Sequence, residues 1–482
     1  MLRSELRAPI ALLAVLAIFA AVLLKLPGYL ASPEILGTVI AAQVIIAAVC
    51  SYKKYFFAVL MLSFLWAGIG LPLSGAWLQG RWIMLAVGAL AGLAVYMKER
   101  DHHFGAIHLV SFFCVLSAVV SASVSGYPQE ALLKSVSLFL LFLYGAAGAR
   151  LAVPTFRPEI FFRRLLVACE IVTYVSTISY FVLRVPIFGN PNSLGAIMGV
   201  VIVPVMLWGF LCAGTVLVRR RLGFELCLAL MLLMSSFSRA GIAAGILSCL
   251  LVCMALKQHR LILSGAVAIV AIAMVAAMFA PRPTEEMKDA GSESVTALFL
   301  YKGKPQQGLL GSRKGPWEQT FSVIRDHPWF GSGFGTSVTA QSTTEFELTR
   351  QHFIDSRMIR EHGNSYLAIL EWSGLLGVFP FYLLVGTAAW NAKRALTQLR
   401  RSPTVFSPLI PAAGIVVAGF IGAAFEDWLF AVGYYVCVFF WAMVFILADL
   451  THQGPAELRV AELAGHTVLM PAAHFAGSPA SQ

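Results

Sequence analysis

The sequence predicts an all-α protein that crosses a lipid bilayer many times. Of its 482 residues, 59% are hydrophobic and only 12% are charged, and the mean hydropathy is +0.80. Soluble domains carry about 25% charged residues, so most of this chain is expected to lie in lipid. Lipid offers no hydrogen-bond partners to an exposed backbone, so spanning segments must be α-helices. Apolar runs of spanning length predict a polytopic integral membrane protein with about 12–14 transmembrane helices.

Candidate spans follow one another along the chain with short polar connections. Fourteen apolar runs lie near residues 8–24, 34–50, 56–72, 82–97, 106–122, 131–149, 165–183, 194–217, 222–236, 240–256, 261–280, 364–390, 408–424 and 430–449. The run at 222–236 is the shortest of them. The first run follows MLRSELR and lacks a convincing small-x-small cleavage site, so it is interpreted as a retained helix and not as a signal peptide.

The distribution of lysine and arginine predicts the orientation of these helices. With the N-terminus inside, nineteen of these residues lie in inner loops, and five lie in the short outer segments. The five outer residues are Lys25, Arg81, Lys134, Arg184 and Arg239. Because cytoplasmic loops carry the excess of positive charge, both termini are predicted in the cytoplasm. The net charge of +11 therefore reflects topology, and no nucleic-acid partner is expected.

Four segments are predicted on this basis. Residues 1–280 hold transmembrane helices 1–11, residues 281–361 form one large periplasmic loop with short helices such as 315–326, residues 362–449 hold the last three spans, and residues 450–482 form a disordered cytoplasmic tail. A long outer loop with its own structure is usually functional. The eight cysteines lie in or beside apolar runs, which predicts neither a disulfide framework nor a metal site.

Two motifs at the predicted outer face contain small residues and possible ligands. In FGNPNSLGAIMG (188–199), Asn190 or Asn192 can cap a new helix, and Gly189 and Pro191 form the turn before it. In SSFSRAGIAAGI (235–246), Arg239 stands at the mouth of a hairpin. Capping and interfacial snorkelling explain these residues without a ligand, although an outer arginine between two spans is unusual.

The large loop and a later turn contain the other charged candidates. In GSRKGPWEQTFSVIRDHPWFGSGFGTS (311–337), Arg313 precedes an amphipathic segment, and three glycines at 331, 333 and 335 form either a ligand loop or a surface turn. In FEDW (425–428), Glu426 and Asp427 either pair with outer arginines or lie in a solvated turn.

The stretch EHGNSYLAILEWSGLLG (361–377) places a histidine before a long apolar run. Asn364 suits the N-cap of that helix, which leaves His362 just outside the positive end of the helix dipole. The dipole and nearby arginines disfavour imidazolium, so the imidazole is expected to be neutral, as a general base must be. The alternative is an interfacial histidine bonded to a loop carbonyl. Gly374 and Gly377 are interpreted as helix-packing glycines.

These motifs, in this order around one large loop, resemble the O-antigen ligase and polymerase superfamily of bacterial membrane glycosyltransferases over roughly residues 185–445. The resemblance implies a GT-C-type fold and an undecaprenyl-diphosphate-linked saccharide donor, without a metal or other cofactor. His362 matches the family's catalytic histidine, and Arg239 and Arg313 match its diphosphate-binding arginines. One departure is Gly363, which separates the histidine from Asn364.

The expected reaction is a single displacement with inversion at the anomeric carbon. The arginines neutralise the diphosphate leaving group and His362 takes the acceptor proton; Asn192, Asn364, Glu371 and Asp427 are candidate supporting residues. The acceptor is a glycan or lipid A-core, and chain-length regulators or export proteins are candidate partners, all at a bacterial inner membrane. Two alternatives stay open: a transporter or flippase of lipid-linked saccharide, and a non-catalytic component of a glycan assembly complex.

Overall fold

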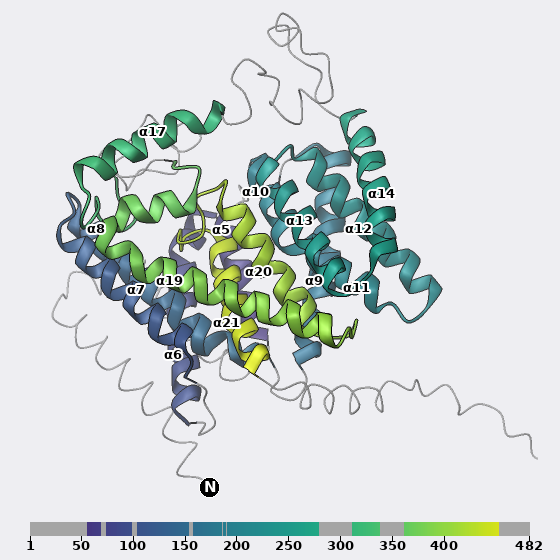
Figure 1. The fold of residues 1–482 in the computed structure, drawn as a ribbon, viewed down its shortest axis with the longest axis horizontal. Helices are drawn as coiled ribbons and strands as arrows, with labels where there is room; N and C mark the ends of the chain where they lie inside the picture. The colour runs from purple at the N-terminus through teal and green to yellow at the C-terminus, as the bar shows by residue number, and fades with distance from the viewer. Residues whose placement is uncertain are drawn as a thin grey trace, which may run out of the picture.

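The structure is a computed structural model of the chain, and its described part is a helix bundle (Figure 1). It describes residues 55–68, 74–98, 104–153, 158–185, 187–188, 190–278, 311–337 and 361–452. These ranges contain helices and turns and no strand, so the predicted all-α class is confirmed. The predicted spans 8–24 and 34–50, Gly189, most of the large loop and the tail after residue 452 lie outside the described residues.

The helices follow one another closely along the chain. They are α5 (Phe56–Gly68), α6 (Ser74–Lys98), α7 (Ala106–Ser123), α8 (Pro128–Leu143), η2 (Tyr144–Gly148), η3 (Ala149–Ala152), α9 (Pro158–Thr177), η4 (Ile178–Leu183), α10 (Pro191–Ala196), η5 (Ile197–Ile202), α11 (Val203–Cys212), α12 (Val216–Ser235), α13 (Arg239–Ala255), α14 (His259–Met278), α17 (Gly311–Asp326), α19 (Ser365–Arg401), α20 (Leu409–Ala423) and α21 (Tyr435–His452). Short π or 3-10 turns extend α8 and α9 and join α10 to α11, which makes three long continuous segments.

Seven helical segments of the described part are long and apolar enough to cross a membrane. Four shorter apolar helices accompany them, in α5, α13, α14 and α20. Helix α12 is more charged, because three arginines (219–221) follow its first three residues and it contains Glu225. Every predicted span from 56–72 onward coincides with a helix. The total number of crossings stays a prediction, since the first two spans lie outside the described residues.

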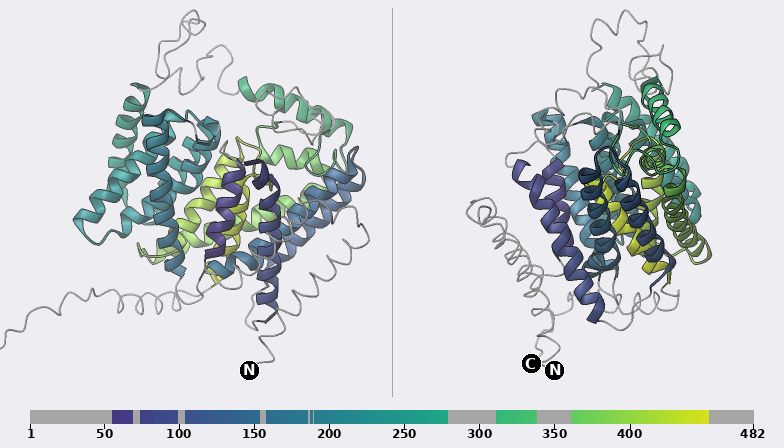
Figure 2. Two further views of the ribbon diagram at one scale, coloured as in Figure 1. Left: turned by 180° about the vertical axis from the view of Figure 1, so that it is seen from behind. Right: turned by 90° about the vertical axis from the view of Figure 1, so that its left-hand side faces the viewer.

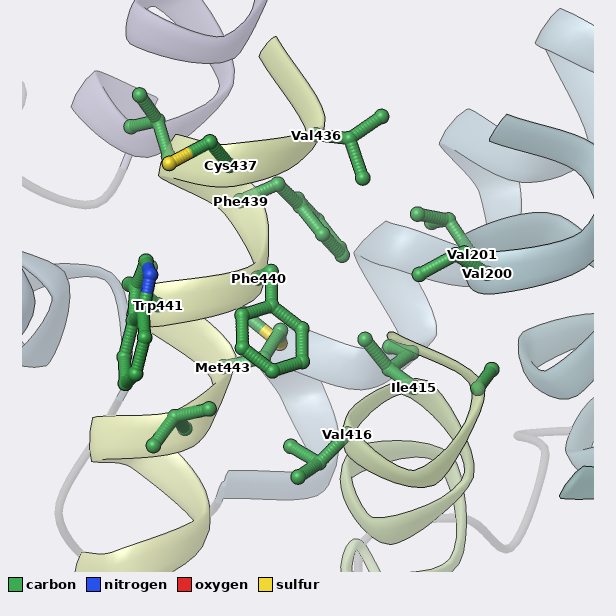
Figure 3. Close-up of a cluster of buried hydrophobic side chains, with 14 of the residues drawn as sticks. Val200, Val201, Ile415, Val416, Val436, Cys437, Phe439, Phe440, Trp441 and Met443 are labelled. Carbon is green, nitrogen blue, oxygen red and sulfur yellow. The ribbon is translucent and has the colours of Figure 1, made fainter. Parts of the chain in front are cut away.

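The hydrophobic core is centred on α20 and α21. Side chains of η5, α20 and α21 meet in one cluster that includes Val200, Ile415 and Phe440 (Figure 3). The view from behind in Figure 2 shows α5 beside α21, where the rings of Phe57 and Phe439 lie 5.9 Å apart. This core also holds the turn at residues 424–434, which joins α20 to α21, because Nε1–H of Trp441 donates to the carbonyl of Leu429 at 2.7 Å.

Two predicted motifs pack against each other through glycines. A Cβ on Gly199 of η5 would lie 2.1 Å from the carbonyl oxygen of Gly241 in α13, and a Cβ on Gly241 would lie 2.2 Å from the carbonyl oxygen of Gly195. Backbone contact this close is possible only without side chains. The SRAG motif therefore packs directly against the NSLG motif, and this contact fixes the start of α13.

Helix α19 is broken at Gly374, which has φ 66° and ψ −177°. Residues 328–337, which we call the plug, fill the break. The amides of Ser332 and Gly333 donate to the carbonyls of Glu371 and Trp372, at 2.9 and 3.2 Å. The plug thus replaces hydrogen bonds that the broken helix cannot make for itself, which a membrane segment requires.

Backbone carbonyls of the plug accept hydrogen bonds from the α19 amides that follow the break. The amides of Leu375 and Leu376 donate to the carbonyls of Pro328 and Trp329, at 2.8 and 3.1 Å. A Cβ on Gly374 would lie 2.4 Å from the carbonyl carbon of Trp329. The interpretation of Gly374 as a helix-packing glycine is therefore wrong, because its conformation makes the break itself. The plug glycines form no surface turn, since Gly331 packs against the α19 backbone, Gly333 against Ser125, and Gly335 against Lys134 of α8.

Candidate active site

The candidate residues gather at one end of the bundle, which we call the loop face. It is formed by α17, the turn at 424–434 and the N-terminal ends of α10, α13 and α19, and it lies uppermost in Figure 1. Asn364 caps α19 there, since its side chain accepts from the amides of Tyr366 and Leu367 at 2.8 and 3.1 Å. The predicted cap is confirmed, and it holds His362 two residues outside the helix.

His362 lies between two carboxylates. Its Nε2 is 3.2 Å from Oε1 of Glu371, and its Nδ1 is 3.4 Å from Oδ2 of Asp427. The backbone amide of His362 also donates to Oδ2 of Asp427 at 2.8 Å. The histidine itself is 1% exposed, whereas the side chain of Asp427 is 27% exposed. Asp427 therefore hydrogen-bonds Nδ1 of the imidazole, Glu371 lies beside Nε2, and Asp427 is the member of the group that solvent reaches.

The two carboxylates beside His362 add an electrostatic influence that the sequence analysis did not include. The prediction of an uncharged imidazole considers only the helix dipole and the arginines. Glu371 and Asp427 act in the opposite direction, because an opposite charge within hydrogen-bond distance favours a protonated ring. The two carboxylates therefore stabilise positive charge on the ring.

Arg313 comes from α17, inside the helix and not before it as predicted. Its Nη1 lies 3.0 Å from Oε1 of Glu361, and its Nη2 lies 2.9 Å from Oε1 of Glu426. The side chain crosses directly over Gly363: a Cβ there would lie 2.5 Å from Nη1 of Arg313. The glycine that departs from the family pattern thus leaves room for the arginine.

Arg239 is the first residue of α13, where the Ser238 side chain caps the helix by accepting from the amide of Gly241 at 3.3 Å. Burial acts on the Arg239 guanidinium most strongly, and the positive charge of Arg313 acts on it as a second influence. Two guanidinium groups held near each other repel, and an anion between them relieves that repulsion. Segments that are far apart in the chain therefore bring Arg239, Arg313 and His362 to one region of the loop face.

The turn at 424–434 contributes two carboxyl groups with different properties. Burial raises the pKa of Glu426 to about 7, although the Arg313 charge opposes this shift. Burial also acts to raise the pKa of Asp427, but hydrogen bonds from His362 and the charge of that ring outweigh it, so the pKa lies below its usual value. Glu426 thus titrates near neutrality, while Asp427 stays ionised.

The other sequence candidates lie around this group. Asn190 caps α10 by accepting from the amide of Ser193 at 2.7 Å, so Asn192 is not the cap. Within the described residues, no hydrogen bond or ion pair links Asn192 to His362, Arg239 or Arg313. The described ranges also contain no group of three or more His, Cys, Asp or Glu side chains arranged to hold a metal ion.

Two residues of the site could not be predicted from the sequence, because neither belongs to a motif that indicates a functional role. Ser337 ends the plug, and its hydroxyl donates to Oε1 of Glu371 at 2.7 Å. Glu361 reaches Arg313 from the exposed side. The sequence did not decide whether Glu426 pairs with an arginine, because FEDW fits a solvated turn equally well; in the structure Glu426 is the half-buried partner of Arg313.

A comparison with known protein families finds a match for part of the chain that contains most of these residues. Residues 224–382 match the family described as O-Antigen ligase. The match covers about a third of the chain and shows what this segment is similar to. The O-antigen ligase segment runs from α12 into α19 and includes Arg239, Arg313, His362 and Glu371, whereas Glu426 and Asp427 follow it. A comparison with curated proteins finds no match. The resemblance of the chain to the O-antigen ligase and polymerase superfamily is thus confirmed, and its helices make it a multi-pass membrane protein.

Proposed function

We propose that the protein is an inverting glycosyltransferase that moves a saccharide from undecaprenyl diphosphate to an acceptor sugar hydroxyl without a metal ion. The convergence of Arg239, Arg313 and the His362–Asp427 pair at the loop face is the observation that carries this proposal. The O-antigen ligase domain supports the class of reaction.

The two arginines bind the donor diphosphate. Guanidinium groups bind phosphate oxygens through paired hydrogen bonds and stay charged at all relevant pH values. Negative charge develops on the diphosphate as the glycosidic bond breaks, and preorganised positive groups stabilise it. To reach Arg313 the diphosphate displaces Glu426, its half-buried carboxylate partner.

The His362–Asp427 pair takes the proton from the acceptor hydroxyl. The hydroxyl approaches from the side of Asp427, because that side chain is partly exposed and the imidazole is not. As the acceptor oxygen bonds to the anomeric carbon, the bond to the diphosphate breaks, and the leaving group keeps that electron pair. The proton passes to the pair and rests on the imidazole, which the two carboxylates stabilise. One displacement without an enzyme nucleophile inverts the anomeric configuration.

The loop face is assigned to the periplasmic side of a bacterial inner membrane. The excess of lysine and arginine in the opposite loops supports this orientation. A lipid-linked oligosaccharide donor would hold its hydrocarbon chain among the spans and present its sugar to the loop face. The product is a longer polysaccharide or a glycan joined to lipid A-core, with chain-length regulators or export proteins as partners.

The test uses purified protein in lipid nanodiscs with a lipid-diphosphate-linked oligosaccharide and an acceptor, in the presence of EDTA. We expect Arg239→Ala and Arg313→Ala each to lower kcat by about 10²–10³-fold, and His362→Ala by about 10²–10⁴-fold. Matched controls are Lys314→Ala, the highly exposed neighbour of Arg313, and His327→Ala, an exposed histidine of the same segment. These should keep wild-type turnover within about twofold.

Wild-type turnover in all three site variants would overturn the proposal. In cells, the deletion strain should accumulate lipid-linked units at the periplasmic face. Absence of such units from that face would instead indicate a transporter. Wild-type glycan in a triple site variant would indicate a non-catalytic component.

A further inference from the structure

The three aromatic side chains of the plug differ in their exposure. Phe334 is 1% exposed and stacks on the ring of Phe381, with the two centroids 5.9 Å apart. Trp329 and Phe330, at the start of the plug, are 59% and 43% exposed. The rest of the plug packs against the bundle, and aromatic rings contribute a large apolar area when they are buried. This exposed aromatic pair therefore indicates a partner outside the described helices.

Backbone hydrogen bonds place the pair beside an exposed apolar part of α19. The carbonyls of Pro328 and Trp329 accept from the amides of Leu375 and Leu376, at 2.8 and 3.1 Å. The side chains of both leucines are exposed, and they belong to a helical segment that is long and apolar enough to cross a membrane. Exposed leucines on such a segment face lipid. Trp329 therefore adjoins a lipid-facing surface.

The lipid-facing surface continues on α7 and α8. Ser117 of α7 donates to the carbonyl of Gly377 at 2.7 Å, and Lys134 of α8 donates to the carbonyl of Gly335 in the plug. Both helices lie in segments of spanning length, and α8 lies with α17 at one edge of the bundle in Figure 1. Their exposed apolar side chains include Leu116, Val120, Leu132, Leu133 and Val136. The plug thus contacts helices at the periphery of the bundle, where the bilayer begins.

The residues just before the plug are charged or polar. Arg325 and Asp326 end α17, His327 follows them, and all three are exposed. Trp329 comes two residues after His327. In membrane proteins, charged side chains stay in water while tryptophan and its aromatic neighbours lie at the level of the lipid headgroups. The change from charged to aromatic residues over 325–330 is therefore typical of a segment at the membrane–water boundary.

We propose that Trp329 and Phe330 anchor the plug in the interfacial region of the bilayer, in the leaflet beside the loop face. The partner is the zone of headgroups and glycerol, which accommodates aromatic rings and offers oxygen acceptors to an indole N–H. This anchor requires only that the chain spans a membrane, so it is independent of the proposed transferase reaction.

The anchor gives the plug a fixed depth relative to the bilayer. The same segment contacts lipid at its start and the centre of the candidate site at its end, where the Ser337 hydroxyl donates to Oε1 of Glu371 at 2.7 Å. That oxygen lies 3.2 Å from Nε2 of His362. The bilayer surface is therefore a reference plane for the part of the large loop that packs against α19.

An acceptor glycan is the other ligand that exposed aromatic rings could bind. Sugar hydroxyl groups require placed polar partners beside the rings. The exposed side chains that adjoin the pair along α19 are instead Leu375, Leu376 and, one turn further, Phe379. These neighbours favour lipid, and the experiment includes glycan binding as an outcome.

The experiment measures the depth of single labelled positions in proteoliposomes of phosphatidylcholine and phosphatidylglycerol. The full-length chain without its native cysteines carries Trp329→Cys, Phe330→Cys, His327→Cys or Phe379→Cys, each labelled with the environment-sensitive fluorophore NBD. The quenchers are iodide in the aqueous phase and lipids that carry a nitroxide either near the glycerol or near the end of the acyl chain. His327→Cys is the aqueous control, and Phe379→Cys is the control within the spanning helix.

We expect the labels at 329 and 330 to have blue-shifted emission, to be quenched most by the nitroxide near the glycerol, and to be protected from iodide. The label at 327 should be quenched by iodide and little by either lipid. The label at 379 should be quenched most by the deeper nitroxide, because α19 runs away from the loop face after the break. Two positions separated by a single proline and one further residue would then report opposite environments.

Iodide quenching at 329 and 330 as strong as at 327 would overturn the anchor. If added soluble oligosaccharide then changed the emission of these labels, the pair would be a glycan-binding surface. Protection from iodide and from both lipids would show that protein covers the pair, which also overturns the proposal.

A variant that keeps the aromatic ring tests the same point without a label. Trp329→Phe is conservative in size and should fold as the wild type does. It should remove part of the tryptophan emission that lipids brominated near the glycerol quench. An unchanged quenched fraction in Trp329→Phe would contradict the anchor, even if both cysteine variants at 329 and 330 failed to fold.

Discussion

Glu426 competes with any anionic ligand for Arg313. Its carboxylate lies 2.9 Å from the guanidinium, and burial raises its pKa to about 7, against the opposing charge of Arg313. A carboxyl group with a raised pKa is neutral below that value and charged above it. Below neutral pH the competing charge therefore disappears, and Arg313 becomes available to a diphosphate. Above neutral pH the ion pair forms and must be broken by the donor.

This competition predicts a pH dependence of donor binding. The donor KM of the wild type should rise about tenfold between about pH 6 and pH 8, because one protonation event on the competing group accompanies binding. Glu426→Gln should bind the donor more tightly at high pH and show a flat profile over the same range. The measurement is the donor KM at several pH values, at constant ionic strength.

Glu361→Gln is the matched control for that prediction. Glu361 makes the other ion pair with Arg313, at 3.0 Å, but its side chain is 66% exposed. Solvent screens such pairs, and they contribute little. Its removal should leave the pH dependence in place. A pH-dependent KM that survives in Glu426→Gln would show that another group competes with the donor.

At the scale of single elements, the break in α19 depends on Gly374. Its backbone lies in a region that favours glycine, and an added Cβ would meet the backbone of Trp329 at 2.4 Å. Gly374→Ala should therefore lower stability by about 1–3 kcal/mol from backbone strain, with a further loss if the plug is displaced. The measurement is the thermal unfolding midpoint of the purified protein in detergent, together with transferase activity.

Gly386→Ala provides the control within the same helix. A Cβ on Gly386 meets nothing within 4 Å, and alanine is the better helix former. Gly386→Ala should leave stability unchanged or raise it by up to about 1 kcal/mol. Equal melting temperatures in the two variants would mean that the break tolerates a side chain and that the plug does not determine the α19 conformation.

At the scale of the whole molecule, the proposed orientation determines which end of the bundle meets the periplasm. Single cysteines at Lys314 and Arg400 test this, in a background without the native cysteines. Lys314 lies on α17 and Arg400 at the far end of α19, and both side chains are exposed. A membrane-impermeant maleimide should label Lys314→Cys in intact spheroplasts and label Arg400→Cys only after permeabilisation. The reverse pattern would place the loop face in the cytoplasm.

The sequence predicts local features of this protein well. The predicted spans from 56–72 onward coincide with helices, because hydrophobic length is a property of consecutive residues. The Asn364 cap is correct for the same reason, since a cap bonds to amides two and three residues away. Predictions are less accurate where the structure of a residue depends on partners that are far away in the sequence. Gly374 fits a packing glycine or a helix break equally in sequence, and only the plug decides between them.

In the candidate site, too, some features follow from the sequence and others only from the tertiary structure. The sequence by itself determined that the chain is all-α and membrane-spanning, and its motifs selected Arg239, Arg313 and His362 as one group. Only the tertiary structure decided that Glu371 and Asp427 flank the imidazole, that Glu426 holds Arg313, and that Ser337 reaches Glu371. Composition and short-range spacing determine where helices and caps form, because both depend on residues that are close together in the sequence. These side-chain contacts join segments that come together only when the helices pack and the plug enters α19.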